Sequence, residues 1–200
     1  ANNPLQGTYP AYALMEVSSL RDDETTRDQL ETVLADALED EVIVDAVVAQ
    51  SEAQSKALWN LRESMPEAQK HARASIKHDV SVPVSQSVNF IIEASKRVSQ
   101  ALPGIRPCPF GHIGDGNIHY NLTQPADMAA EEFMARYAEF NRIVHDLVVD
   151  MNGSISAEHG IGSFKRDELA HYASPTKISL MKTIKQAHYP DNIMNPGKII

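Results

Sequence analysis

The stretch "PFGHIGDGNIHYNL", Pro109 to Leu122, contains two histidines on either side of a glycine-rich turn. The tetrad Gly114–Asn117 contains the dipeptides Asp-Gly and Gly-Asn, which favour positive φ and tight chain reversal. After this turn, apolar and polar residues alternate over Ile118–Leu122, a pattern typical of a half-buried strand. We therefore expect a chain reversal followed by a strand with His119 and Asn121 on its polar face.

A second alternating segment, "SIKHDVSV" over Ser75–Val82, places Lys77 on the polar face of another strand. Further strands are predicted at Tyr12–Val17 and Val42–Val48, and a helical pattern follows each of them. Alternating strands imply a sheet with one helix-covered face and one polar face. We therefore expect an α+β fold, with a ferredoxin-like antiparallel sheet, helices on one face and a C-terminal helical segment. The polar face of this sheet would carry Lys77 together with the two polar residues of the 118–122 strand.

Capping and breaking residues predict where the helices begin and end. The predicted helices begin near Thr25, after Ser51 with a stop at Pro66, after Ser85 with an end at Pro103–Gly104, at Asp127 with an end at Gly153, and after Ser174. The helix near Thr25 and the one after Ser51 each have an apolar stripe at helical spacing, as expected for helices that pack on one side.

The composition excludes several classes of protein. The chain has 200 residues, of which 42% are hydrophobic, and this is enough for one sizeable globular domain. Its formal net charge of −9 argues against a basic surface, so we expect no nucleic-acid partner. A single cysteine, Cys108, excludes an intrachain disulfide. Because no apolar run approaches the ~20 residues of a membrane span, we expect no transmembrane segment and a cytoplasmic location.

Two further residues join the histidines as candidates for chemistry. His112 precedes the turn and could approach His119 across it. In "SAEHGIG", Glu158 and His159 are adjacent in a glycine-bounded loop, so both could serve one site. Two imidazoles and one carboxylate are the three protein ligands of an open catalytic zinc site, which would leave His159 free to act as a base. The alternatives are two turn-flanking histidines without a ligand and a Glu-His pair without a function.

Several motifs together carry a resemblance to a known family. The segments "LRESMPEA", "KHDVSVP", "GHIGDGNIHYNL", "SAEHGIG" and "NPGKII" resemble the C-terminal domain of FAD-linked oxidases of the vanillyl-alcohol oxidase type, with D-2-hydroxyacid dehydrogenases as the most similar group. The resemblance implies that residues 1–200 form the substrate- and metal-binding domain. A division into an α+β core over 1–152 and a helical tail over 153–200 is an alternative. We expect the FAD-binding domain to lie outside this sequence, because no dinucleotide-binding fingerprint follows a strand.

The resemblance also implies a reaction and a set of roles. Such enzymes, which include D-2-hydroxyglutarate and D-lactate dehydrogenases, oxidise a 2-hydroxy acid to the 2-oxo acid and transfer a hydride to FAD. By resemblance, the metal ligands are His112, His119 and Glu158, the general base is His159, and the substrate is held by Arg62, Lys77 and Asn121. The metal would most simply be zinc, although manganese and iron suit the same ligands.

Some questions stay open at the level of the sequence. Pro66 stands where the 2-hydroxyglutarate enzymes tend to have a hydroxyl residue, which puts recognition of a distal carboxylate in doubt and leaves D-lactate and D-malate open. A metal-dependent hydrolase with the same two histidines and glutamate is the competing function, and a non-catalytic binding module is a third. The oligomeric state, a homodimer included, is also open. We expect the partners to be a small 2-hydroxy acid and the flavin domain of the same enzyme.

Overall fold

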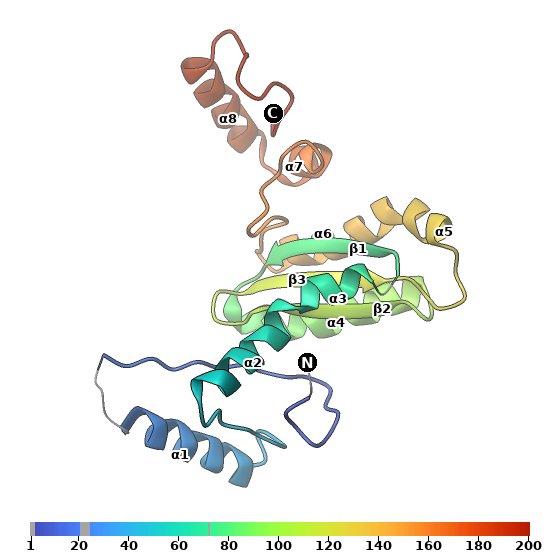
Figure 1. Cartoon of the computed structure of the whole chain (residues 1–200). Coiled ribbons are helices and arrows are strands. Elements are labelled where there is room, and N and C mark those ends of the chain that lie inside the picture. Colours follow the sequence, from blue (N-terminus) through green and yellow to red (C-terminus); the bar gives the residue numbers. More distant parts are fainter. Residues whose placement is uncertain (1–2, 21–24, 72) are drawn as a thin grey trace. The chain divides into compact units, whose positions relative to one another are not determined.

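The computed structural model describes residues 3–20, 25–71 and 73–200. The chain divides into two compact units, Ala1–His71 and Ala72–Ile200. The second unit contains the sheet and most of the residues singled out by the sequence (Figure 1).

The first unit carries the predicted helices. The two predicted helices are α1 (Thr25–Glu39) and α2 (Glu52–Glu63), and a short helix that was not predicted, α3 (Met65–Lys70), follows α2. As predicted, Ser51 caps α2, and its side chain accepts the N–H of Gln54 at 3.3 Å. The helix ends before Pro66, which lies in the first turn of α3, where its missing N–H leaves no hydrogen bond unmade.

The prediction of two strands in this unit, at Tyr12–Val17 and Val42–Val48, is wrong. Both segments are irregular chain and pair with no other strand in the described part of the molecule. Met15 is 57% exposed and Val44 is 78% exposed, so an apolar core does not cover them. A largely apolar segment forms a strand only where a partner satisfies its backbone hydrogen bonds and a core covers its apolar side chains.

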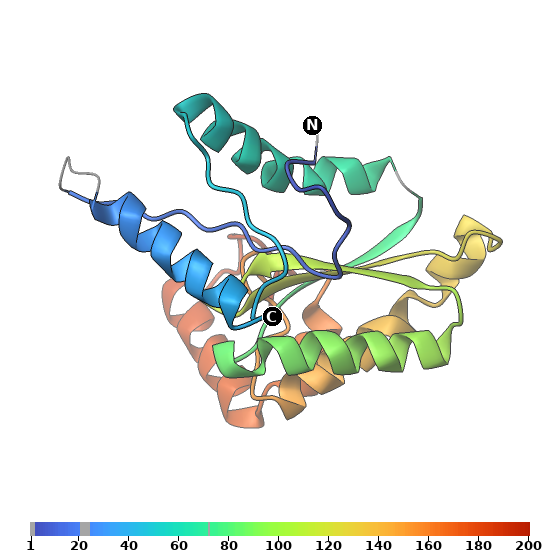
Figure 2. The ribbon, with the colours of Figure 1, turned by 90° about the horizontal axis from the view of Figure 1, so that it is seen from below.

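The second unit is built on a three-stranded antiparallel sheet with the order β1-β3-β2. The strands are β1 (Ser75–Ser81), β2 (Arg106–His112) and β3 (Asn117–Thr123). The short helix η1 (Val84–Gln86) follows β1, and α4 (Ser87–Ala101) follows it. Helices α4 and α6 (Tyr137–Asp150) cover one face of the sheet (Figure 2). This arrangement confirms the α+β class and the helices on one face.

The helix-covered face forms the hydrophobic core. Alternate side chains of β1 and β3 are fully or almost fully buried there and pack on apolar residues of α4 and α6. These core residues are Ile76, Val80, Phe90, Val98, Ile118, Tyr120, Leu122, Phe140, Val144 and Val148. The core therefore leaves the opposite face of the sheet for polar side chains.

The helix predicted to run from Asp127 to Gly153 is divided in two. Residues after Pro125 form a turn, in which the N–H of Met128 donates to the carbonyl of Pro125 at 3.4 Å, so α5 (Ala130–Ala135) begins later than predicted. The chain then breaks at Arg136, whose side chain donates to the carbonyl of Ala101 at 2.9 Å. This hydrogen bond holds the break between α5 and α6 against the C-terminal end of α4.

The C-terminal helical segment is present as predicted. It consists of α7 (Arg166–Tyr172) and α8 (Pro175–His188), and the side chain of Ser174 caps α8 by accepting the N–H of Lys177 at 3.2 Å. Helix α7 is tied to α6, because the hydroxyl of Tyr172 donates to Asp146 at 2.6 Å. Among the described residues, no helix has the length and apolarity to cross a membrane.

Candidate metal and substrate site

The polar face of the sheet brings the predicted residues of β1 and β3 together. In the antiparallel register, Lys77 lies opposite Asn121, and Asp79 lies opposite His119. On the other side of β3, His112 of β2 lies opposite Asn117. Residues that are paired in this way point to the same face of a sheet. The register therefore places Lys77, His119 and Asn121 on one face, as the alternation predicted, and adds His112 to the same face.

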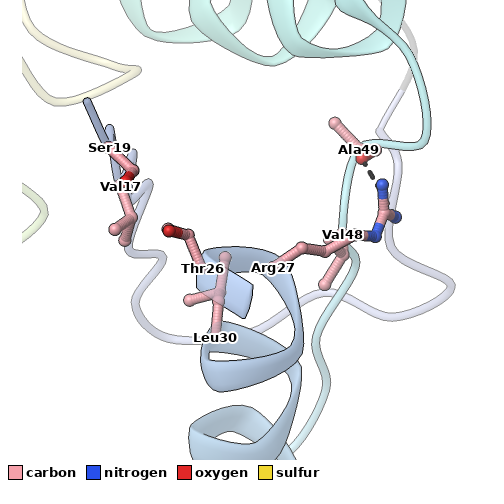
Figure 3. A pocket seen from close by; sticks show the side chains of 7 residues that line it. All are labelled: Val17, Ser19, Thr26, Arg27, Leu30, Val48 and Ala49. Atoms are coloured by element: carbon pink, nitrogen blue, oxygen red, sulfur yellow. Dashed lines mark hydrogen bonds between the residues drawn. The ribbon is translucent and has the colours of Figure 1, made fainter. Parts of the chain in front are cut away.

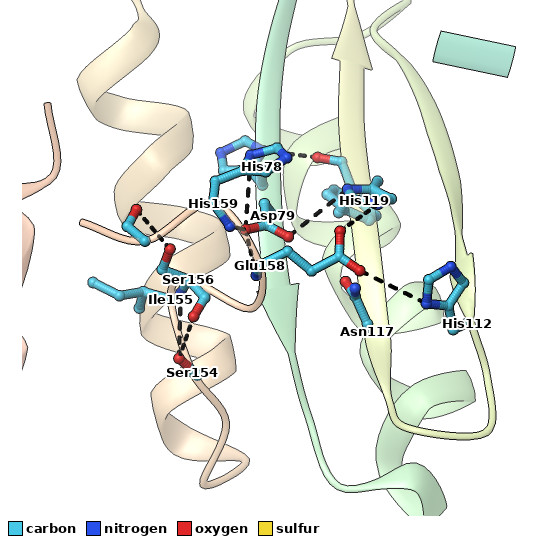
Figure 4. A network of polar contacts seen from close by, with 12 residues as sticks. His78, Asp79, His112, Asn117, His119, Ser154, Ile155, Ser156, Glu158 and His159 are labelled. Atoms are coloured by element: carbon cyan, nitrogen blue, oxygen red, sulfur yellow. Dashed lines mark hydrogen bonds and ion pairs between the residues drawn. The ribbon is translucent and has the colours of Figure 1, made fainter. Parts of the chain in front are cut away.

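The segment that follows α6 supplies the other two candidates. Ser154 pairs with Ser81 at the edge of β1, through two backbone hydrogen bonds of 2.8 and 3.0 Å. Gly153 is required just before it, because a Cβ at this position would lie 2.2 Å from the carbonyl oxygen of Ser81. This edge contact carries Glu158 and His159 to the end of the sheet where the histidines lie (Figure 4).

The carboxylate of Glu158 lies between the two predicted histidine ligands. One oxygen is 3.8 Å from Nδ1 of His112, and the other is 3.7 Å from Nε2 of His119 (Figure 4). Two ligand atoms on one tetrahedral zinc lie roughly 3.4 Å apart, given metal–ligand bonds of about 2.1 Å. The three side chains have the chemistry of divalent-metal ligands, and each histidine lies near a different oxygen of Glu158. Glu158 and His112 are about half exposed, so the site is open to solvent.

A second acidic residue, Asp79, is part of the same cluster, although the motifs of the sequence assigned it no role. It is 3% exposed, and its oxygens lie 3.8 Å from Nδ1 of His119 and 3.7 Å from Nδ1 of His159. One donor atom each from Asp79, His119 and His159 lies within 4.8 Å of the others, and among the described residues this is the set whose donor atoms lie close enough together to hold one metal ion. The sequence does contain one signal for Asp79. It lies two residues after Lys77 and therefore on the same face of the alternating strand.

The environment of Asp79 favours its charged form. Burial alone would raise the pKa of this carboxyl. The backbone N–H groups of His159 and Glu158 and the charges of His159 and Lys165 outweigh that effect and hold the pKa below its usual value. An ionised carboxylate therefore lies beside the candidate metal ligands and the candidate base.

The candidate substrate residues lie in both units. Lys77 is exposed on β1, whereas Asn121 on β3 is 4% exposed. Arg62 lies on α2 of the first unit, where its side chain is half-buried. The binding roles of these three residues stay predictions.

The opposite side of β1 carries a histidine with a structural role. His78 is 1% exposed, and its Nδ1 lies 2.8 Å from the carbonyl of Tyr120. Burial, together with the neighbouring His145, lowers the pKa of His78 to about 3. His78 is therefore neutral in the folded protein and belongs to the core, although its neighbour in the sequence points to the site.

A pocket in the first unit does not have the character of a substrate site. It is lined by Val17, Ser19, Thr26, Arg27, Leu30, Val48 and Ala49 (Figure 3). Its charged residue, Arg27, pairs with Glu31 at 2.9 Å and also donates to the carbonyl of Ala49 at 3.5 Å (Figure 3). Two of the guanidinium nitrogens are therefore engaged, and none of the candidate site residues lines this pocket.

Comparison with protein families gives one match that spans nearly the whole chain. The family described as FAD linked oxidases, C-terminal domain, matches residues 2–199.

Individual relatives agree with this match. The chain is 40% identical to a D-2-hydroxyglutarate dehydrogenase of Stutzerimonas stutzeri over 98% of its own length and 42% of the relative. It is 33% identical to the mitochondrial D-2-hydroxyglutarate dehydrogenase of Arabidopsis thaliana, over 99% of the chain and 34% of the relative. A D-2-hydroxyglutarate–pyruvate transhydrogenase of Saccharomyces cerevisiae is 31% identical, over 98% of the chain and 40% of the relative. The chain thus spans less than half the length of these curated relatives.

Proposed function

The chain belongs to the family of FAD linked oxidase C-terminal domains, and we propose that it is the substrate- and metal-binding half of an FAD-dependent D-2-hydroxyacid dehydrogenase. The observation that carries the proposal is the carboxylate of Glu158 between His112 and His119. The names of the relatives make D-2-hydroxyglutarate the first substrate to test. D-lactate and D-malate are the alternatives, because Pro66 offers no hydroxyl to a distal carboxylate.

We assign the metal to His112, His119 and Glu158. A divalent metal bound there would supply a Lewis acid that polarises the hydroxyl of the substrate. Two imidazole nitrogens and a carboxylate suit zinc, and they also suit manganese and iron. Three protein ligands would leave room for the substrate, in agreement with the exposure of Glu158 and His112.

We assign proton transfer to His159. Its side chain is 67% exposed, and its ring stacks on that of the proposed ligand His119 with the ring centroids 5.8 Å apart. An imidazole is suited to this role because it exchanges protons near neutral pH. As the C–H bond of the α-carbon breaks, the hydroxyl proton passes to His159 and the C–O bond becomes a carbonyl. FAD, bound by the part of the enzyme outside this sequence, supplies the acceptor for the hydride.

We assign recognition of the substrate carboxylate to Lys77 and Arg62, with Asn121 as an orienting residue. Lys77 and Asn121 lie opposite each other on the polar face, so an ammonium and an amide could contact the same anion. A guanidinium fork matches the geometry of a carboxylate, which supports the role of Arg62.

The cytoplasmic location also remains a proposal, since relatives include a mitochondrial enzyme.

The test is oxidation of D-2-hydroxy acids by the flavin-containing enzyme that includes this chain. D-2-hydroxyglutarate, D-lactate and D-malate would be offered with an artificial electron acceptor, and the 2-oxo acid would be measured. His159→Gln should lower kcat by about 10²–10⁴-fold, the usual contribution of a general base. An unchanged kcat in His159→Gln would overturn the assignment of His159 as the base. Hydrolysis of an ester or amide by the same preparation, without any oxidation, would instead favour the metal-dependent hydrolase.

A further inference from the structure

We propose that Asp79 is a positioning residue, which orients the proposed metal ligand His119 and the proposed base His159 through their Nδ1 atoms. The inference rests on the proposed function, because it assigns a role to a residue behind the proposed site. Asp79 lies in the middle of β1 and is 3% exposed, so its carboxylate is directed into the protein rather than to solvent.

Asp79 first fixes the loop that carries the proposed ligand and base. Its Oδ2 accepts the backbone N–H of Glu158 at 2.9 Å and that of His159 at 2.8 Å. Its own carbonyl accepts the N–H of Ala157 at 3.2 Å. One residue of the sheet thus binds three consecutive residues of the loop. These hydrogen bonds hold the loop at the edge of β1, next to the histidines of β2 and β3.

The other oxygen of Asp79 is directed at the histidines. Oδ1 is buried and has no hydrogen-bond partner among the described residues, and it lies 3.8 Å from Nδ1 of His119. A buried carboxylate oxygen without a donor costs free energy, so an N–H on the facing ring nitrogen is favoured. Nδ1 of His159 lies 3.7 Å from Oδ2, which already accepts two backbone N–H groups, so here the negative charge of the carboxylate favours a proton on the facing nitrogen. Asp79 therefore favours the tautomer with the proton on Nδ1 in both rings.

This tautomer leaves Nε2 of each ring with its lone pair. In His119, Nε2 is the nitrogen that lies 3.7 Å from the carboxylate of Glu158, where the metal is proposed to bind. A metal-bound histidine commonly donates its other N–H to a carboxylate, which orients the ring and raises its basicity. In His159, a free Nε2 is what a base needs in order to accept a proton. The buried carboxylate of Asp79 would then leave Nε2 of His119 free to bind the metal and Nε2 of His159 free to accept a proton.

The competing arrangement makes Asp79 itself a metal ligand. In that case Asp79, His119 and His159 would form the site, and the nitrogens that face Asp79 would have to bind the metal. The two arrangements use opposite nitrogens of His119, and they predict opposite effects for the same substitutions.

The experiment compares Asp79→Asn, Glu158→Gln and the control Asp150→Asn, an exposed residue at the end of α6. Zinc affinity of the full chain would be measured by competition with a chromophoric chelator. The proposal expects Asp79→Asn to weaken zinc about 10–100-fold, the usual effect of losing a carboxylate behind a ligand histidine. Glu158→Gln should weaken zinc more strongly, and Asp150→Asn should change nothing. Complete loss in Asp79→Asn with near-normal affinity in Glu158→Gln would overturn the proposal in favour of direct ligation by Asp79.

A second measurement separates this proposal from the proposed metal site. Nitrogen NMR shifts of the wild-type chain without metal report the ring tautomers, and the proposal expects the proton on Nδ1 in both His119 and His159. A chain that binds no zinc but shows these tautomers would refute the metal site and support the role of Asp79. The opposite tautomer, with the proton on Nε2 in both rings, would overturn the role of Asp79 even if zinc binds. This readout needs no variant, so a misfolded Asp79→Asn protein would not prevent the test.

Discussion

The carboxylate of Glu158 lies 3.7 Å from Nε2 of His119, although one residue belongs to a loop after α6 and the other to the central strand of the sheet. The contact depends on the edge pairing of Ser154 with Ser81 and on the hydrogen bonds that Asp79 accepts from the loop. The cluster is therefore a product of the fold of the second unit, and changes in that fold should affect the proposed binding of a metal.

We predict that Gly153→Ala destabilises the second unit by about 1–3 kcal/mol, the usual cost of forcing extra atoms into a packed site. The new Cβ would lie 2.2 Å from the carbonyl oxygen of Ser81 and 2.9 Å from that of Val148. Urea unfolding would measure the loss, and zinc affinity should fall with it because the loop after Ser154 must shift. Gly114→Ala is the matched control, since nothing lies within 4 Å of its added Cβ. Equal stability of the two variants would contradict the role of the edge pairing.

Lys77→Met should raise the KM for the 2-hydroxy acid roughly 10- to 100-fold, the value of a hydrogen bond between charged groups. Thermal stability should stay the same, because Lys77 is exposed and its replacement creates no cavity. Steady-state kinetics of the flavin-containing enzyme would measure the change. Lys96→Met, at an exposed position on α4, is the control and should leave KM unaltered. An unchanged KM in Lys77→Met would remove Lys77 from the substrate site.

The buried His78 should make the protein less stable at acidic pH. Its pKa is about 3 in the folded chain and near the ordinary 6.5 in the unfolded chain, so between these values the unfolded chain binds more protons. Stability is then fully present above pH 6.5 and is lost as the pH falls toward 3. From pH 7 to pH 5 this one group should cost about 2 kcal/mol.

The measurement is the free energy of unfolding in urea at several pH values. His78→Asn removes the titrating group, so its stability should change less between pH 7 and pH 5 than that of the wild type. His71→Gln replaces an exposed histidine at the C-terminal end of α3, and its stability should change between pH 7 and pH 5 as much as that of the wild type. If the stability of His78→Asn changed with pH as much as that of the wild type, the assignment of His78 as a neutral buried imidazole would be contradicted.

The part of the fold that the sequence predicted is the part governed by local patterns. Alternation in Ser75–Val82 and Ile118–Leu122 predicted two strands with a shared polar face, and the register of β1 and β3 confirms that face. The apolar run Val42–Val48 was also predicted to be a strand, and this prediction is wrong, because sheet pairing depends on partners far away in the chain. Helix starts at Ser51 and Ser174 were predicted correctly, because capping is a contact between near neighbours.

The candidate site shows the same distinction. The sequence singled out His112, His119 and Glu158, and the structure brings them together. Asp79 was missed as part of the cluster, because its role depends on hydrogen bonds to a loop about eighty residues later in the chain, which no local pattern reveals. Its alternation with Lys77 fixed the face to which it points but not what it would meet there.

The most direct test of the proposed site is the metal content of the purified chain, determined by elemental analysis. We predict close to one divalent metal ion per chain in the wild type and none in the double variant His112→Ala with His119→Ala. The control carries His71→Ala and His188→Ala, two exposed histidines elsewhere, and should keep its metal. A wild-type chain that holds no metal and takes up neither zinc nor manganese, or a double variant that keeps its metal, would contradict the site formed by His112, His119 and Glu158.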